Sequence, residues 1–324
     1  MKNILIFASE IGSTKFIYNS IIAVENINFT FILSNDQNPK LYNDTRIINF
    51  KEFDLTTIKN FDLGILSFNA SKEDLILGGL LKKNNINFGS YIDSWMNIEK
   101  KCSKYKGQME MIGKFLLVPT LDLCKFIEKS LERSVEIYDV GHSDLENVEK
   151  QKVLKTPRRG VAIYSQPIFK YFGNTIFNEY DLVRYSVSYL KKYSCKLKPI
   201  NIVLHPTENI NKFNFLVNDE VNVSVSYGDE FESKKVLPKL VILLFTTRLI
   251  NTYLEKTPTI SLYNGEDESN KDFLKRYTIY SNTLTSFEYN ISNYSETFEK
   301  ATLSKISFLG SKKKFERVLH KLFY

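Results

Sequence analysis

Short apolar runs alternate with amphipathic stretches from Lys2 to Asp139, and this alternation constrains the fold more than any other feature. Apolar runs without polar alternation are typical of strands buried on both faces, and the intervening stretches repeat apolar residues at helical spacing. Such a chain folds into a parallel sheet covered by helices. The pattern predicts strands at Lys2–Ala8, Phe29–Ser34, Arg46–Phe50, Leu63–Ser67, Phe88–Asp93, Lys114–Val118 and Val135–Asp139, and helices at Ser13–Val24, Ser71–Asn84 and Leu121–Leu131.

A second alternation of the same kind begins at Gly160. The segment before it, Ser143–Arg159, is polar and charged and carries Pro157, so we interpret it as a linker. We therefore predict an α/β chain of two Rossmann-like, doubly wound domains, residues 1–150 and 151–324. In the second domain we expect strands at Val161–Ser165, Ile200–Leu204, Val221–Ser226, Val236–Phe245 and Thr259–Leu262, and helices at Asn178–Tyr193 and Arg248–Leu254.

Composition excludes several classes of protein. With 43% hydrophobic and 25% charged residues the chain is neither collagen-like, nor a coiled coil, nor disordered. A net charge of +7 is a mild excess that suits a nucleotide or phospholipid partner and argues against nucleic acid. The apolar stretch before Glu10 is too short for an export signal, and Cys102, Cys124 and Cys195 are dispersed without a CxxC pair, so we expect a cytoplasmic protein.

Candidate residues in the first domain follow its strands, because ligands gather at the carboxyl ends of parallel strands. Glu10 follows the first strand without a GxGxxG motif, and it is either a general base or a solvated loop carboxylate. Ser13 can cap the next helix. Asp93 follows the fifth strand and is either a helix cap or a general base, with Trp95 as one wall of an acceptor cleft and Asn97 beside it.

Two motifs stand out in the second domain. His205-Pro206 directly follows an apolar strand, where a histidine can donate to a phosphate oxygen or simply hold the loop. Thr246-Thr247 opens a helix after another strand, and its hydroxyls either cap that helix or join its N–H groups in a phosphate cradle. The three histidines are too scattered for a metal site, and nucleophile motifs of the GxSxG type are missing. The acidic run Glu266–Glu268 could bind a cation, but we interpret it as a solvated loop.

These motifs resemble bacterial GT-B glycosyltransferases, above all sialyltransferase-like enzymes and capsule or lipopolysaccharide transferases that use CMP-linked nonulosonic acids or Kdo. In those families an HP motif and a Ser/Thr pair in the C-terminal domain hold the CMP. His205-Pro206 and Thr246-Thr247 match in order, with threonines in place of the commoner serines. Tyr91–Asn97 and Tyr164–Pro167 also resemble segments of capsule-type transferases.

The resemblance implies that the two domains face a central cleft and divide the reaction between them. The first domain would bind a surface-glycan acceptor, and Glu10 or Asp93 would deprotonate its hydroxyl, since the acidic motif of some sialyltransferases has no clean match. The second would bind the donor, with no metal and no cofactor beyond the nucleotide sugar. The implied acceptor contacts are Ser13, Trp95 and Asn97, and the implied donor contacts are Gln166, His205, Pro206, Thr246 and Thr247.

The C-terminal segment Phe308–Phe323 combines a basic cluster with apolar residues at helical spacing. It could lie on the inner membrane face, where lipid-linked acceptors reside, or pack back across the first domain. The basic residues for a membrane contact are Lys312, Lys313, Lys314 and Arg317.

Three other functions stay open at this stage. A CDP-alditol phosphotransferase of teichoic-acid type shares the fold and a similar hydroxyl pair. A GT-B-shaped UDP-sugar 2-epimerase would bind UDP instead of CMP. A binding module that has lost catalysis would keep the nucleotide-sugar site without turnover.

Overall fold

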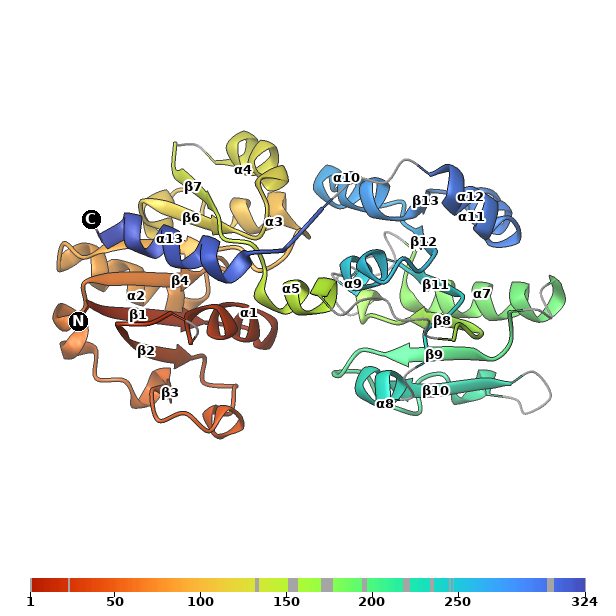
Figure 1. Ribbon diagram of the computed structural model, residues 1–324, viewed down its shortest axis with the longest axis horizontal. Helices are drawn as coiled ribbons and strands as arrows, with labels where there is room; N and C mark the ends of the chain where they lie inside the picture. The colour runs from red at the N-terminus through yellow and green to blue at the C-terminus, as the bar shows by residue number, and fades with distance from the viewer. Residues whose placement is uncertain are drawn as a thin grey trace. The chain divides into compact units, whose positions relative to one another are not determined.

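A computed structural model describes residues 2–22, 24–131, 134–150, 157–169, 177–193, 197–217, 222–233, 236–244, 246, 248–301 and 306–323. The chain forms two compact units (Figure 1). Unit 1 comprises Met1–Lys150 with Ser307–Tyr324, and unit 2 comprises Gln151–Ile306.

The sheet of unit 1 has seven parallel strands in the order β3-β2-β1-β4-β5-β6-β7. The predicted strands are confirmed with small shifts at their ends. The topological switch point lies between β1 and β4, because the chain builds outward from β1 on one side and from β4 on the other. The strands are β1 Lys2–Ala8, β2 Ile27–Leu33, β3 Ile47–Asn49, β4 Leu63–Ser67, β5 Asn87–Tyr91, β6 Phe115–Val118 and β7 Glu136–Asp139.

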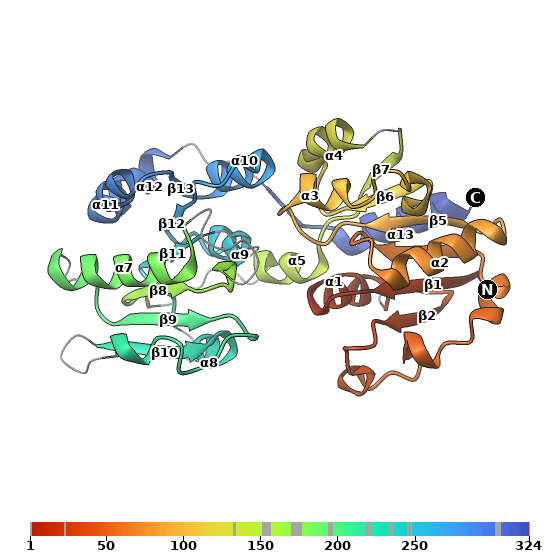
Figure 2. The same ribbon diagram turned by 180° about the vertical axis from the view of Figure 1, so that it is seen from behind.

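Helices cover both faces of this sheet (Figure 2). Alternate residues of β1 enter different apolar clusters: Ile4 and Ile6 join one, and Leu5 and Phe7 join the other. Burial on both faces explains why β1 shows no polar alternation. The helices of unit 1 are α1 Ile11–Ile21, α2 Lys72–Lys83, α3 Ile98–Ser103, α4 Cys124–Ser130, α5 Ser143–Lys150 and α13 Ser311–Phe323.

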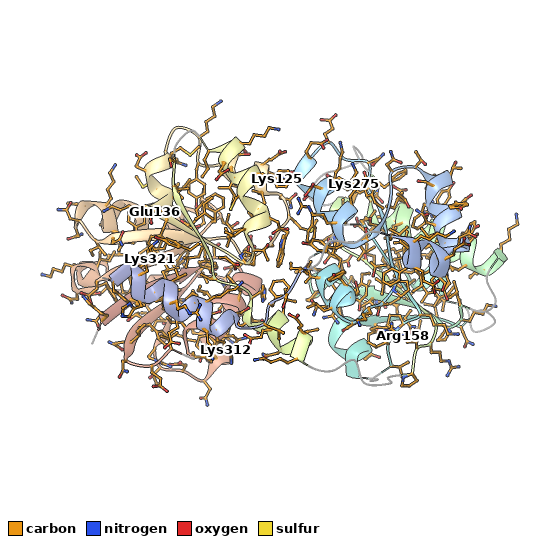
Figure 3. The ribbon with its side chains drawn as sticks, turned by 45° about the horizontal axis from the view of Figure 1, so that its top comes forward. Lys125, Glu136, Arg158, Lys275, Lys312 and Lys321 are labelled. Carbon is orange, nitrogen blue, oxygen red and sulfur yellow. The ribbon has the colours of Figure 1, made fainter. Side chains whose placement is uncertain are left out.

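The C-terminal helix α13 belongs to unit 1. Its Phe315 and Leu319 are fully buried in the cluster that also holds Phe16 of α1. Lys312, at one end of α13, is exposed, whereas Lys321 near the other end places its ammonium 4.8 Å from the Tyr138 ring (Figure 3). The apolar stripe of α13 is therefore used in the core, and its basic residues lie on the outer side.

Unit 2 repeats the architecture with six parallel strands in the order β10-β9-β8-β11-β12-β13, so its switch point lies between β8 and β11. The strands are β8 Val161–Tyr164, β9 Ile200–Leu204, β10 Val223–Tyr227, β11 Leu240–Leu243, β12 Thr259–Leu262 and β13 Ile279–Ser281. The helices are α7 Glu179–Tyr193, α8 Gly228–Ser233, α9 Arg248–Leu254, α10 Glu268–Tyr277, α11 Leu284–Ser292 and α12 Tyr294–Lys300.

The linker interpretation of Ser143–Arg159 is wrong for its first half. Ser143–Lys150 forms α5, whose Glu146 is buried and accepts the backbone N–H of Gly310 at 3.1 Å. Because a glutamate occupies a buried position of α5, the sequence of this helix lacks the apolar periodicity that would predict it. Residues 151–156 of the predicted linker lie outside the described ranges.

The acidic run Glu266–Glu268 is not simply a loop either. The Asp267 side chain accepts the backbone N–H of Asn270 at 3.0 Å and caps α10. Before the C-terminal segment, the last element predicted from the sequence corresponds to β12, so β13, α11 and α12 were not predicted. Among the described residues, no helix is long and apolar enough to cross a membrane.

We expect Phe315→Ala to lower the free energy of unfolding of unit 1 by ~3 kcal/mol, because it opens a cavity in a fully buried cluster. Urea unfolding monitored by circular dichroism measures this. Phe215→Ala is the control, since the Phe215 side chain is 63% exposed. A cost below ~1 kcal/mol for Phe315→Ala would contradict the packing of α13 described above.

Candidate functional site

Three neighbouring strands of unit 1 bring polar side chains to one edge of the sheet. Glu10 follows β1, Asn69 follows β4 and Asp93 follows β5, and these strands are adjacent in the order β1-β4-β5. A Cβ added to Gly12 would lie 3.8 Å from Asp93 Oδ2, so the Asp93 carboxylate faces the start of α1. Lys101 Nζ donates to Asp93 Oδ1 at 2.9 Å, and both side chains are 13% exposed.

Glu10 is one of the two carboxylates expected to act as base, and its pKa is raised above the usual value. Its pKa is raised by partial burial and by the negative charge of Asp93, while Lys101 and Asn69 oppose the shift. The side chain remains accessible to solvent. A raised pKa makes a carboxylate a stronger base than an ordinary glutamate. Asp93, by contrast, is paired with an ammonium group.

A hydrogen-bonded chain leads from Glu10 into the core. The amide of Asn69 bonds Glu10 and also donates to Ser9 Oγ at 2.8 Å. Ser9 and Ser67 hydroxyls are 2.9 Å apart, and Ser67 Oγ donates to Asp74 Oδ1 at 2.6 Å. Asp74 is 2% exposed, and burial raises its pKa to about 7. This network fixes the Asn69 amide on which the orientation of Glu10 depends.

The structure places the other expected acceptor residues less favourably. Trp95 is only 2% exposed, and its indole N–H donates to Thr120 Oγ1 at 3.0 Å. Its ring packs in the interior, so the expected aromatic wall of an acceptor cleft presents no open face here. Asn97 adopts a left-handed backbone at φ 57° directly before α3. Ser13 lies in the first turn of α1, and its side chain is outside the description.

His142 was not predicted as a site residue, yet it packs beside this cluster. Its ring stacks on Trp95 at 6.4 Å with an interplanar angle of 12°, and its centroid lies 4.6 Å from that of Phe16. Burial lowers the pKa of His142 to about 4, against the opposing charges of Asp144 and Asp93. A neutral imidazole therefore supports the Asp93 loop. The signal available in the sequence was its place directly after the last strand of the domain.

In unit 2 the described donor residues of the prediction follow three neighbouring strands, β9, β8 and β11, at the same edge of the sheet. Ser165 and Gln166 follow β8, His205 follows the adjacent β9, and Thr246 follows β11 on the other side of β8. The imidazole Nδ1 of His205 accepts the backbone N–H of Thr207 at 3.3 Å and lies 2.8 Å from its hydroxyl. Because Nδ1 is the acceptor, the neutral ring carries its proton on Nε2. Burial lowers the pKa of His205, and Glu208 opposes this.

The threonine pair is described only in part. Thr246 is 8% exposed, and its hydroxyl accepts the backbone N–H of Arg248 at 3.3 Å, which caps α9. Thr247 lies outside the described residues. Pro206 is exposed, and Gln166 is half-buried.

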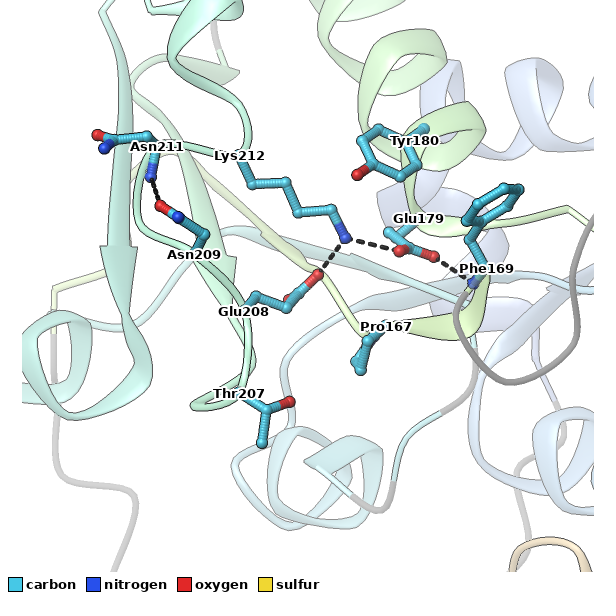
Figure 4. A pocket seen from close by; sticks show the side chains of 9 residues that line it. All are labelled: Pro167, Phe169, Glu179, Tyr180, Thr207, Glu208, Asn209, Asn211 and Lys212. Atoms are coloured by element: carbon cyan, nitrogen blue, oxygen red, sulfur yellow. Dashed lines mark hydrogen bonds and ion pairs between the residues drawn. The ribbon is translucent and has the colours of Figure 1, made fainter.

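A cavity of about 440 Å³ opens beside the His205 loop (Figure 4). Glu208, Lys212 and Glu179 form its polar wall, with Lys212 Nζ 2.6 Å from a carboxylate oxygen of each glutamate. Sequence reasoning assigned no role to these three residues. Glu208 stood next to a recognised motif, but Glu179 and Lys212 carried no signal, because only the fold brings them together. Among the described residues, no cluster of three acidic, His or Cys side chains could hold a metal ion.

No protein-family model matches the chain, and no curated protein matches it. Solved structures do match it over the whole length. UDP-GlcNAc 2-epimerase from Neisseria meningitidis bound to UDP-GlcNAc has TM-score 0.70 at 12% identity, covering 99% of this chain and 100% of its own. The lipopolysaccharide outer core galactosyltransferase WaaB has TM-score 0.61 at 13% identity, covering 99% of both chains. The wall teichoic acid polymerase TagF has TM-score 0.54 at 11% identity, covering 98% and 88%.

These similarities and the two parallel sheets define the fold as GT-B, which confirms the predicted fold class. They do not support the narrower resemblance to CMP-sugar transferases. At such identities they establish architecture, and the chemistry has to be argued from the residues.

We expect the buried Asp74 to make unit 1 less stable as the pH rises. Its folded pKa of about 7 exceeds the unfolded value of 3.8, so stability is greatest below about pH 4 and falls until about pH 7. The loss is at most ~4 kcal/mol. Urea unfolding at pH 4.5 and pH 8 should show this fall in the parent and a smaller one in Asp74→Asn. Parallel pH profiles for the two proteins would contradict the assignment.

Proposed function

We propose that this chain is a GT-B glycosyltransferase that binds a nucleotide-sugar donor at the carboxyl edge of unit 2. The observation that supports it best is the state of His205. Its Nδ1 is engaged by Thr207, so an Nε2–H donor is held at a strand end next to the switch point. Parallel α/β sheets bind phosphorylated ligands at this place. Gln166 and Thr246 follow the two strands that flank the switch point.

The proposed reaction needs a base for the acceptor and a partner for the departing phosphate. The Glu10 carboxylate accepts the proton of an acceptor hydroxyl, and that oxygen attacks the anomeric carbon of the donor sugar. The bond from that carbon to the phosphate oxygen breaks, and the nucleotide leaves with both electrons. His205 and Thr246 then meet the phosphate charge, the task a metal serves in other transferases. Asp93, with Lys101 beside it, would shape the acceptor site.

For the donor we propose a CMP-linked nonulosonic acid or Kdo, on the likeness of His205-Pro206 and Thr246-Thr247 to the families named above. A lipid-linked surface glycan is the proposed acceptor. Lys312, Lys313 and Arg317 are exposed on α13 and suit anionic head groups at a membrane surface. Lys314 is already engaged, since it donates to Asp139 Oδ2 at 2.7 Å.

A UDP-sugar 2-epimerase is the second candidate, because a UDP-GlcNAc 2-epimerase shares the fold over its full length. Such an enzyme also needs acid and base groups near a nucleotide site, and Glu10, Asp93 and His205 could supply them. The identity of the bound nucleotide separates the two candidates, as does turnover with the donor alone.

We expect CMP to raise the melting temperature of the protein more than CDP, UMP, UDP or GDP, because a ligand of the folded state stabilises it by RT ln(1 + [L]/Kd). Differential scanning fluorimetry measures the shift, and His205→Gln should abolish it. A preference for UDP would favour the epimerase, and a preference for CDP the alditol phosphotransferase. No response to any nucleotide would sink the proposal.

We expect Glu10→Gln to lower kcat about 10²- to 10⁴-fold, the usual contribution of a general base, with little change in donor affinity. Asp93→Asn should raise the KM for acceptor more than it lowers kcat. Initial rates with a CMP-sugar donor and a glycan acceptor give both values. The outcome that would reassign the base is a kcat that survives in Glu10→Gln and collapses in Asp93→Asn.

A further inference from the structure

The Glu208 carboxylate ties together the two loops that carry the candidate donor residues. Its Oε2 accepts the backbone N–H of His205 at 2.8 Å. Its Oε1 accepts the hydroxyl of Ser165, in the loop after β8, also at 2.8 Å. One buried side chain therefore sets the spacing between the ends of β8 and β9.

Lys212 extends this link to the start of α7 (Figure 4). Its ammonium donates to Glu208 Oε1 and to Glu179 Oε1, each at 2.6 Å, while Glu179 Oε2 accepts the backbone N–H of Phe169 at 2.9 Å. The Glu179 and Glu208 side chains are 2% exposed and that of Lys212 is 11% exposed. We call Glu179, Lys212 and Glu208 the Glu–Lys–Glu cluster.

A gain in stability alone is a poor explanation for the Glu–Lys–Glu cluster. Taking two carboxylates and one ammonium out of water is costly, and apolar residues of similar volume often stabilise as well or better. What the Glu–Lys–Glu cluster adds is geometry, because its contacts end on main-chain and hydroxyl groups of the loops that follow β8 and β9. These are the loops that hold His205 and Gln166.

We propose that Glu208 is a positioning residue for His205, holding the loop so that the imidazole meets the phosphate of the bound nucleotide. This inference rests on the proposed function of unit 2. The charge of Glu208 also acts on the imidazole of His205, which lies on the same loop. Lys212 bridges Glu208 to Glu179. Its negative charge favours the imidazolium, whereas burial disfavours it.

Because Glu208 and Lys212 carry opposite charges, removing one or the other should shift the pKa of His205 in opposite directions. Glu208→Gln removes a negative charge and should lower the pKa of His205 further. Lys212→Met leaves two carboxylates without their cation and should raise it. A side chain that merely fills space would not move the pKa of His205 in opposite directions in the two variants.

The experiment combines proton NMR of the histidine rings with nucleotide titration. The chain has three histidines, so the C2 proton of His205 can be assigned by its loss in His205→Gln. We expect Glu208→Gln and Lys212→Met to shift the His205 pKa in opposite directions, and each to weaken nucleotide binding about tenfold, the effect of losing one charged hydrogen bond. Lys300→Met is the matched control, since Lys300 pairs with Glu296 on the surface of the same unit.

An unchanged His205 pKa and unchanged affinity in Glu208→Gln would overturn the inference, and so would equal effects of Lys300→Met. Should Glu208→Gln fail to fold, Lys212→Met carries the test, and the His205 pKa must then rise. If the parent protein binds no nucleotide, the proposed function fails and the positioning role fails with it, while opposite pKa shifts would show that Glu208 acts on His205 through its charge.

Discussion

All strands of a parallel sheet run in the same direction, so their carboxyl ends lie at one edge of the sheet. The placement of the polar residues in both units depends on that constraint. In each unit the polar residues that follow neighbouring strands are brought together although they are far apart in the chain. Glu10 and Asp93 lie close to each other in unit 1 in this way, and Gln166, His205 and Thr246 follow neighbouring strands at the same edge in unit 2. Ligands of open parallel sheets bind at topological switch points, and the switch point of unit 2 lies between β8 and β11.

The two edges differ in how their charges are held. In unit 1, Asp93 is paired with Lys101, and Glu10 keeps a raised pKa through partial burial and the neighbouring Asp93. In unit 2, two carboxylates share one ammonium behind the His205 loop. In the first arrangement partial burial and the charge of Asp93 raise the pKa of Glu10. In the second, burial lowers the pKa of His205, and the negative charge of Glu208 opposes that shift.

Much of the fold could be predicted from the sequence, because strands buried on both faces give continuous apolar runs. Lys2–Ala8, Leu63–Ser67, Ile200–Leu204 and Thr259–Leu262 were placed correctly at both ends. The helix α5 could not be read, since its buried Glu146 is satisfied by main-chain groups of a segment more than 160 positions away.

The candidate site was predictable only where residues directly follow strands. His205 and Glu10 were found by that rule. Trp95 was expected to form one wall of an acceptor cleft, but its side chain is buried and its indole N–H donates to Thr120. Lys212 donates to Glu179, which lies 33 positions earlier at the start of α7, and no local sequence pattern predicts this ion pair.

The most direct test of the account locates the nucleotide on the chain. Hydrogen–deuterium exchange followed by mass spectrometry, with and without saturating CMP, reports which peptides are protected. The account predicts protection of the peptides that contain Ser165–Pro167 and His205–Glu208, at the carboxyl edge of unit 2. Protection confined to the opposite edge, around Asn201 and Asn222, or to unit 1 alone, would contradict it.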